Sequence, residues 1–340
     1  MKKVFFLGIA AAAMLASCSN DETVKISQSG AIGFSNTFVN NGTRSISDPS
    51  STTSNLQSFD VYGFTQLGQI FDGTTVSKGG SGWSYTPIQY WVEGNTYTFG
   101  AVAPAGTGVN GEALTNGKVT MTIPFTSDGT TDLLHAAPAA IEADADFIAS
   151  PQPVALTFSH QLSKVKFSFE NAVGEGYNVK VTNIKITNAK ETGTLTVADG
   201  VDNAWSAQAG SLELAFGNAV ADGVDTDADP IANGGEAESY NEMLLIPTTD
   251  AESYTVTFTA ELLQGEVSLG SWDHTATISG VELKLGYCYD FKAELNEKNI
   301  VVDPDDPDAE LKPIEFMVSR VEDWNQTDQD QTVDIPTGGQ

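Results

Sequence analysis

Three kinds of side chain in this sequence could take part in chemistry: histidine, cysteine and grouped carboxylates. The histidines are His135, His160 and His274, and none lies in an H-x-x-H, H-E-x-x-H or Cys/His pattern, so the ligand spacing of a zinc site is missing. The G-x-S-x-G and P-loop motifs are absent as well. Because a Ser-His-Asp triad is defined by geometry rather than by spacing, a hydrolase stays open as an alternative that no motif supports. We expect no catalytic residue, no metal and no cofactor.

One acidic segment has the oxygen spacing of a calcium loop. Positions 1, 3, 5, 9 and 12 of an EF-hand-like count are filled by Asp225, Asp227, Asp229, Asn233 and Glu236. Pro230 stands where such a loop needs glycine, and no helical pattern flanks the segment. The sequence therefore favours a solvated acidic loop and leaves calcium binding open.

A group of aromatic residues could stack on sugar rings. Its members are Trp83, Tyr85, Tyr90 and Trp91. Aromatic residues at strand spacing more often pack in a core than bind ligands. The group is nevertheless the basis of one alternative function, a surface glycan-binding lipoprotein of a polysaccharide-uptake system, which requires these aromatics to be exposed on one face.

The N-terminus has the pattern of an exported, lipid-anchored protein. Lys2 and Lys3 precede an apolar stretch over residues 4–16, which is too short for a permanent transmembrane helix. The stretch ends in Leu15-Ala16-Ser17-Cys18, which resembles a bacterial lipobox closely. We therefore expect residues 1–17 to be a signal peptide, Cys18 to carry acyl chains such as palmitate, and residues 18–30 to be a tether.

The composition argues against one class of partner, nucleic acid, and against an intramolecular disulfide. The chain has 16 Lys+Arg against 45 Asp+Glu, a formal net charge of -29, which repels phosphate backbones, so nucleic acid is not an expected partner. Arginine occurs only as Arg44 and Arg320. With Cys18 lipidated, Cys288 has no disulfide partner, and we expect it to be an inert buried thiol.

Short alternating segments predict an all-β fold. Apolar residues recur at every second position in residues 97–103, 119–125, 164–169 and 254–262, and the phase changes within 177–187, which indicates a bulge. Segments 154–159, 313–322 and 331–335 are further strand candidates, and 139–148 is a short helix candidate. Many short strands between turn signals favour antiparallel β-sandwiches with Greek-key connections.

We expect two such domains. Ser150-Pro151-Gln152-Pro153 marks the boundary, which gives an N-terminal domain over residues 31–152 and a C-terminal domain over 153–340 with terminal strands within 313–335. The polar, Gly-rich stretch 199–235 is predicted to form insertion loops. The Asp/Pro segment 303–308 is predicted to be an extended linker.

Several segments occur in the order found in one family. They are Thr43-Arg44, LQSFDVYGF at 56–64, WSYTPIQYW at 83–91, YTFGAVAP at 97–104, LTFSHQLSKV at 156–165 and a late Trp324, all behind a lipobox. This succession resembles the fimbrillin-like lipoproteins of Bacteroidetes, the subunits of type V pili, over nearly the whole chain. The acidic residues after Cys18 resemble the surface-export signal of lipoproteins from the same bacteria.

The resemblance implies a fold and a mechanism. The fold would be two β-sandwich domains of transthyretin-like topology, on a protein lipid-anchored at the outer membrane and exposed on the cell surface. An Arg-specific protease would cut after the first strand, here at Arg44. The strands of a neighbouring pilin subunit would then fill the vacated groove, with a host or bacterial surface ligand as a further partner. The donor candidates are Ile314, Phe316, Val318, Val333 and Ile335, although the strand over 313–322 could instead complete its own domain.

Overall fold

The computed structural model describes residues 30–39, 56–80, 82–198, 202–221, 226–248, 251–300 and 312–324. Several predicted residues lie outside these ranges and remain predictions: Leu15, Ala16, Ser17, Cys18, Arg44, Val333 and Ile335, together with the signal peptide and the linker at 303–308.

The described part of the chain is almost entirely β-structure. Up to residue 160 it forms β1 (Phe34–Val39), β2 (Ser58–Thr65), β3 (Gly68–Gly79), β4 (Gly82–Ser84), β5 (Thr96–Ala103), β6 (Asn110–Thr115), β7 (Lys118–Thr126), β8 (Leu134–Ala136), β9 (Ile141–Glu142), α2 (Ala145–Ala149) and β10 (Val154–His160). After residue 160 it forms β11 (Ser163–Asn171), β12 (Tyr177–Ala189), β13 (Thr192–Val197), β14 (Ala204–Ala209), β15 (Leu212–Gly217), β16 (Ala219–Val220), β17 (Ile231–Ala232), β18 (Glu236–Ser239), β19 (Met243–Leu245), β20 (Glu252–Gln264), β21 (Val267–Val281), β22 (Tyr287–Leu295), α3 (Glu297–Ile300) and β23 (Phe316–Asp323).

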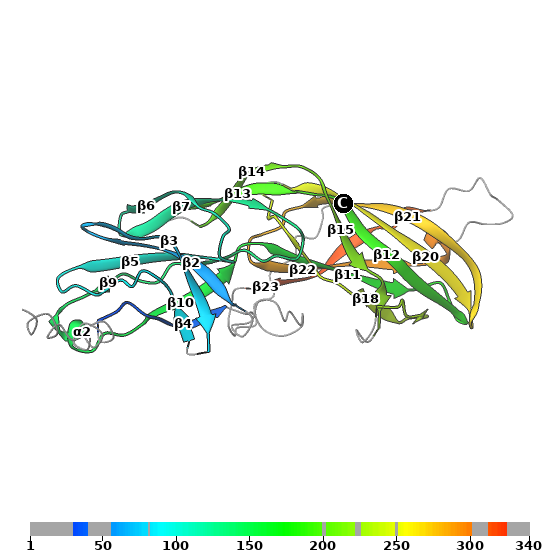
Figure 1. The fold of residues 1–340 in the computed structure, drawn as a ribbon. Coiled ribbons are helices and arrows are strands. Elements are labelled where there is room, and N and C mark those ends of the chain that lie inside the picture. The colour runs from blue at the N-terminus through cyan, green and yellow to red at the C-terminus, as the bar shows by residue number, and fades with distance from the viewer. Residues whose placement is uncertain are drawn as a thin grey trace, which may run out of the picture.

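Within the described ranges the strands form four sheets. An eight-stranded sheet runs β1-β10-β8-β5-β2-β3-β4 with β9 beside β5, and a four-stranded sheet runs β14-β13-β7-β6. A six-stranded sheet runs β16-β18-β11-β22-β23 with β19 beside β11, and a five-stranded sheet runs β15-β12-β20-β21 with β17 beside β12. Figure 1 shows an elongated molecule, with the eight-stranded sheet at one end and the long β12, β20 and β21 at the other.

The side chains between the sheets form three buried clusters. The N-terminal core includes Ile32, Phe34, Phe59, Phe71, Phe99 and Phe158. The central core includes Tyr62, Phe64, Met121, Ile123, Leu195, Trp205 and Trp324. The C-terminal core includes Phe167, Phe169, Phe216, Phe258, Phe291 and Ile314. Because alternate residues of β2 enter the N-terminal and the central core, the eight-stranded sheet is buried on both faces.

Strands that precede residue 152 pair with strands that follow residue 153 in two of the four sheets. β10 follows that position and pairs with β1 and β8, while β13 pairs with β7. Only Gln161 and Leu162 separate β10 from β11, which belongs to the six-stranded sheet, and residues 160–169 are buried throughout. One continuous buried segment therefore links the two ends of the molecule. The division into domains 31–152 and 153–340 stays a prediction.

The structure confirms the all-β class and much of the predicted strand set. β5, β7, β10, β11 and β20 lie at the predicted segments. In β12 the pairing with β20 shifts register between Thr182 and Lys185, where Asn183 has φ 56°, as the phase change predicted. Two pairings are parallel, β1 with β10 and β11 with β22, so the sheets are not purely antiparallel. The Greek-key connections and the transthyretin-like topology stay predictions.

One segment prediction is wrong, and another is confirmed only in part. The stretch 199–235, expected to form insertion loops, contains β14, β15, β16 and β17. Its average polarity hides a short alternation in which Leu214 and Phe216 are buried and Glu213 and Ala215 are exposed. The helix expected over 139–148 is α2 at Ala145–Ala149, where the Asp144 carboxylate caps the N-terminus by accepting from the Phe147 amide.

Candidate functional site

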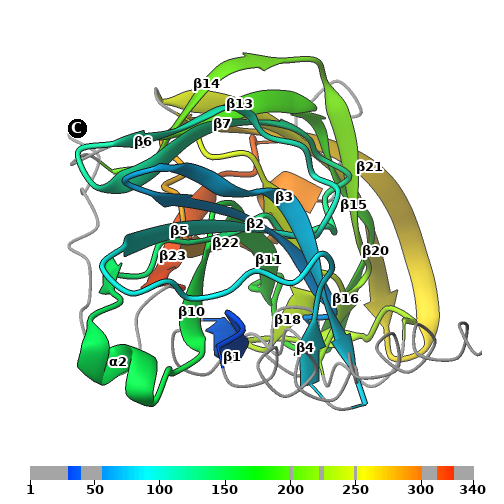
Figure 2. The ribbon, with the colours of Figure 1, turned by 60° about the vertical axis from the view of Figure 1, so that its left-hand side comes forward.

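The first described segment joins the two ends of the eight-stranded sheet. The Trp91 amide donates to Gly30 O and the Ile32 amide donates to Gln89 O, each at 2.8 Å, in the chain that follows β4. On the other side, the Val154 amide donates to Gly33 O at 2.8 Å, and β1 then runs parallel to β10. Figure 2 shows β1 between β10 and β4. The segment therefore closes a seam in the curved sheet.

Phe34 fills a socket of aromatic rings. Its ring centroid lies 5.9 Å from Phe59, 5.8 Å from Phe71, 5.7 Å from Tyr85 and 6.1 Å from Phe99, all in edge-to-face geometry. Such pairs contribute about 0.5–1.5 kcal/mol beyond the area they bury. Phe34 is only 5% exposed, so the socket closes around one side chain of the first segment.

Glycine at position 63 makes room for this socket. A β-carbon on Gly63 would lie 2.8 Å from Phe71 and 3.0 Å from Phe99. Both rings are fully buried and cannot move aside without disturbing Phe34. The socket therefore depends on Gly63 of β2 as well as on the aromatic residues that line it.

Tyr85 adds a polar contact to the seam. Its hydroxyl donates to Ile32 O at 2.7 Å and accepts from the Gln89 amide at 3.2 Å. Burial, as the main cause, raises the pKa of Tyr85 above its ordinary value of 10.0, so the phenol stays protonated and can donate. Tyr85 thus ties the first segment to the chain after β4.

The first segment holds its place through a few concentrated contacts. Ile32 is 1% exposed, so it and Phe34 are the two buried apolar side chains among its described positions. Full burial of each contributes about 1.5–3 kcal/mol, which gives roughly 3–6 kcal/mol together.

The late strand β23 lies at the edge of the six-stranded sheet. It pairs antiparallel with β22 from Phe316 opposite Ala293 to Asp323 opposite Tyr287. Ile314 is buried, and the Phe316 ring lies 5.2 Å from Phe167. Val318 packs against the same C-terminal core. Three of the five donor candidates therefore contact the core of their own chain.

Trp324 ends the described part of the chain in a buried contact. Its ring stacks on His160 with centroids 3.4 Å apart, and the Lys164 ammonium lies 4.2 Å from the ring centre. His160 in turn contacts Asp132, with 2.6 Å between Nδ1 and Oδ2. His160 is fully buried in this contact.

Other predicted chemistry is dispersed in the structure. Asp229 accepts from the Ala221 amide and Glu236 pairs with Lys292, while Asp225 lies outside the described residues. Among the described residues there is no group of three His, Cys, Asp or Glu able to hold a metal ion. Cys288 is buried, as predicted. No helix in the described part of the chain is long and apolar enough to cross a membrane.

The aromatic group on which the glycan-binding alternative rests is mostly turned inward, as its strand spacing favoured. Trp91 is 7% exposed and packs edge-on against Tyr97, and the Trp83 ring lies 4.9 Å from Phe59. Tyr90 is the exception at 42% exposure. These aromatics belong to the N-terminal core rather than to an exposed sugar-binding face.

Comparison with known proteins agrees with the resemblance found in the sequence. The family model described as fimbrillin-like matches residues 43–333. The chain belongs to the fimbrillin-like family. The match begins after β1, so the first strand precedes the matched region of this fimbrillin-like chain.

One solved structure shares the fold, and others are similar at lower TM-scores. A fimbrial protein from Bacteroides vulgatus superposes with a TM-score of 0.57 at 16% identity, covering 87% of this fimbrillin-like chain and 99% of that one. Candidate cell adhesion proteins from Bacteroides uniformis and Bacteroides ovatus, each 16% identical, give TM-scores of 0.42 and 0.44 and cover 87% and 88% of this chain, and 97% and 98% of theirs. No curated protein matches the chain significantly.

Sequence reasoning missed the residues that receive the first strand. The socket of Phe59, Phe71, Tyr85 and Phe99 comes from four separate segments, and only Phe59, Tyr85 and Phe99 lie in segments quoted for the resemblance. Asp132, the partner of His160, was missed as well. Local alternation indicates which residues are buried, but it does not show which distant rings meet around one side chain.

Proposed function

We propose that the chain is a cell-surface lipoprotein and a structural or adhesive fimbrial subunit of the type V pilus kind, assembled by protease-triggered donor-strand exchange. Membership of the fimbrillin-like family supports the fimbrial role. The observation that carries strand exchange is the seam: residues 30–34 connect β10 to the chain after β4 and place Phe34 in the aromatic socket.

Loss of the first segment would leave a groove of defined chemistry. The Trp91 and Val154 amides and Gln89 O would lose their partners, and the aromatic socket would open to water. Unpaired backbone groups beside an apolar socket are what an incoming strand satisfies in β-augmentation. A neighbour's strand that pairs with these backbone groups and fills the socket would restore both the hydrogen bonds and the buried apolar contacts.

Cleavage at Arg44 would release that segment. Arg44 follows the end of β1 by five residues, and no other Lys or Arg occurs between Lys25 and Lys78. A trypsin-like cut in this region therefore has a single target. The released segment would include Cys18 and its acyl chains, so one cut would free both the groove and the membrane anchor.

The donor is the tail after Trp324 rather than β23. Phe316 lies among three rings of its own C-terminal core, and Trp324 fixes the end of β23 by stacking on His160. Removing β23 would expose that core. Val333 and Ile335 are two apolar residues spaced as Ile32 and Phe34 are, so the tail can supply a matching pair.

The test uses the two arginines of the chain as a matched pair. The mature chain carrying Cys18→Ser is incubated with an Arg-specific protease, alongside the same chain with Arg44→Gln or with Arg320→Gln. Arg320 lies in β23, where paired strand backbone resists cutting. We expect the unsubstituted chain and the Arg320 variant to be cut to an N-terminus at Ser45 and to form ladders on unheated SDS gels.

The Arg44 variant should stay uncut and monomeric. A chain lacking residues 331–340 should be cut yet form no ladder. Ladders from the Arg44 variant would overturn the cleavage trigger, and ladders from the truncated chain would overturn the tail as donor. For the anchor, radiolabelled palmitate should enter the Cys18 chain and not the Cys18→Ser chain in cells.

A further inference from the structure

The aromatic socket around Phe34 has a fixed size. Its wall rings contact one another as well, because the Phe71 ring centroid lies 5.3 Å from Tyr85 and 5.9 Å from Phe99. Phe59, Phe71 and Phe99 are each at most 1% exposed, so the surrounding core holds these rings in place. A socket packed in this way cannot close around a smaller side chain or open for a larger one without repacking of the core.

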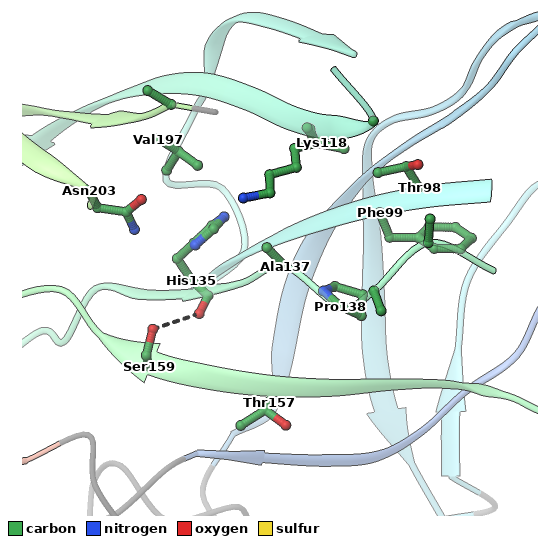
Figure 3. Close-up of a pocket in the computed structure, with 15 residues that line it drawn as sticks. Thr98, Phe99, Lys118, His135, Ala137, Pro138, Thr157, Ser159, Val197 and Asn203 are labelled. Atoms are coloured by element: carbon green, nitrogen blue, oxygen red, sulfur yellow. Dashed lines mark hydrogen bonds between the residues drawn. The ribbon is translucent and has the colours of Figure 1, made fainter. Parts of the chain in front are cut away.

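Two neighbouring strands set the depth of the socket. Gly63 of β2 pairs with Phe99 of β5, and a β-carbon at residue 63 would lie 2.8 Å from the Phe71 ring. Figure 3 shows Phe99 and its neighbour Thr98 on opposite sides of β5, so the Phe99 ring lies on the face that bears the N-terminal core. The lack of a side chain at residue 63 therefore leaves the room that a full aromatic ring occupies.

The contacts of Phe34 require a ring as well as an apolar surface. The four wall rings meet Phe34 at interplanar angles of 84°, 72°, 68° and 85°, so ring edges point at ring faces. A smaller aliphatic side chain would lose these edge-to-face contacts and leave a void. The backbone hydrogen bonds of the seam are made by main-chain atoms and do not distinguish one sequence from another. Discrimination between donor strands therefore depends on the socket.

The tail of this chain has no aromatic residue with which to fill the socket. Residues 325–340 include Val333 and Ile335 but contain no Phe, Tyr or Trp. The tail thus matches the spacing of Ile32 and Phe34 without matching the size of the Phe34 side chain. A second copy of this chain would fill the socket only in part.

We propose that the socket selects its partner, taking a donor strand with an aromatic residue at the position of Phe34 in preference to a strand with an aliphatic residue there. The neighbour that fits this groove best is then a related subunit whose donor strand carries such an aromatic residue, rather than a second copy of this chain. Gly63, Phe71 and Phe99 determine the specificity. The inference rests on the strand exchange proposed above and names the partner.

The test adds a ring to the tail and compares it with a matched control. In the full mature chain with Cys18→Ser, Ile335→Phe places a ring at the position that corresponds to Phe34. Asp334→Phe places the same ring on the opposite face of the strand. After cutting at Arg44, ladders of the Ile335→Phe chain should persist in SDS at least about tenfold longer than those of the parent chain. Asp334→Phe should give no gain.

Peptides measure the same selection without the tail. A labelled peptide of residues 30–39 and its Phe34→Ile form are each added to the cut chain, and fluorescence polarisation follows their binding. The Phe34 peptide should bind at least about tenfold more tightly.

Variants of the socket should reduce this difference between the peptides. In the Gly63→Ala chain, the difference should fall below about threefold, because the added β-carbon takes the room of the ring. Thermal unfolding shows whether this chain is folded, and Phe71→Leu, which removes one wall ring, should give the same result if it is not. Val267→Ala, an exposed position at the start of β21, should leave the difference unchanged.

The outcomes separate partner selection from strand exchange itself. Ladders of equal durability from the parent and Ile335→Phe chains, an equal gain from Asp334→Phe, or equal binding of the two peptides would overturn the selection and leave strand exchange standing. Cutting that yields neither ladders nor peptide binding would overturn strand exchange, and the selection with it.

Discussion

The first and last described strands both lie at sheet edges, but they are held in different ways. Residues 30–39 bond to two separate parts of one sheet and bury two side chains deeply, Ile32 and Phe34. β23 bonds along most of its length to the single strand β22, and most of its own side chains are half-buried or exposed. The first strand thus pairs with β10 and also bonds across the seam to the chain after β4, whereas the last pairs with β22 alone.

This difference teaches which end suits exchange. Under the proposed mechanism, another chain with two apolar side chains at the same spacing would take over the contacts of Phe34 with Phe59, Phe71 and Phe99. A ladder whose flanking residues, Ile314 and Trp324, are buried in two different cores cannot be removed without opening both. The contrast supports the proposal that exchange would occur at the first strand, with β23 kept as part of the fold.

The largest effect should come from Phe34→Ala. Removing a ring from a closed aromatic socket leaves a cavity, and large-to-small changes of this kind cost about 3–5 kcal/mol of unfolding free energy. Urea unfolding measures the loss. Phe316→Ala in β23 is the comparison variant. It should lower the unfolding free energy by less, because the Phe316 side chain is only half-buried. A larger loss for Phe316→Ala would contradict the contrast between the two strands.

Trp324→Ala should follow, with a loss of about 3 kcal/mol. The change removes the stack on His160 and the contact with the Lys164 ammonium. Trp324→Phe keeps a ring over His160 and should recover more than half of the loss. Hydrogen exchange at β23 amides reports whether the strand detaches, and unchanged protection in the alanine variant would show that Trp324 does not hold it.

Acid should destabilise the N-terminal half through His135. The folded-state pKa of about 4 lies below the unfolded value of 6.5, so the unfolded chain binds the proton more readily. Stability is therefore lost as the pH falls from 6.5 towards 4, by about 2 kcal/mol at pH 5. The His135→Gln variant should have a flatter stability profile between these pH values, and a profile as steep as that of the parent chain would refute the assignment to His135.

Met317→Ala should have the smallest effect. The side chain is 69% exposed although it lies in β23 between Phe316 and Val318. Exposed positions away from caps and ion pairs usually change stability by less than about 0.5 kcal/mol. A loss above about 1 kcal/mol would mean that this face of β23 is covered in solution, which analytical ultracentrifugation would then test.

Side-chain alternation along the sequence predicted the positions of the strands better than it predicted which strands pair. Alternation located β5, β7, β11 and β20, and even the irregularity in β12, because side-chain period is a property of one strand. The parallel pairing of β1 with β10 joins residues more than a hundred positions apart, and no local pattern encodes it. The stretch 199–235 was misjudged because its glycines and aspartates concealed the alternation of β15.

The candidate site was predicted only in outline. The family resemblance placed a first strand ahead of Arg44. The socket could not be predicted, since Phe71 and Tyr85 belong to different strands and segments whose meeting depends on the curvature of the whole sheet. The size of the socket was not foreseeable either, because the room beside Gly63 is a property of the packed interior.

The buried link between β10 and β11 also defines how the molecule carries load. β1 runs parallel to β10, β10 continues through Gln161 and Leu162 into β11, β11 runs parallel to β22, and β22 pairs with β23. A pull along the two parallel pairs, β1–β10 and β11–β22, acts in shear on evenly spaced hydrogen bonds, so many bonds share the force instead of breaking one after another. Tension entering at the first strand thus reaches the last through a short series of neighbouring strands, and single-molecule pulling from residues 30 and 324 would measure its strength.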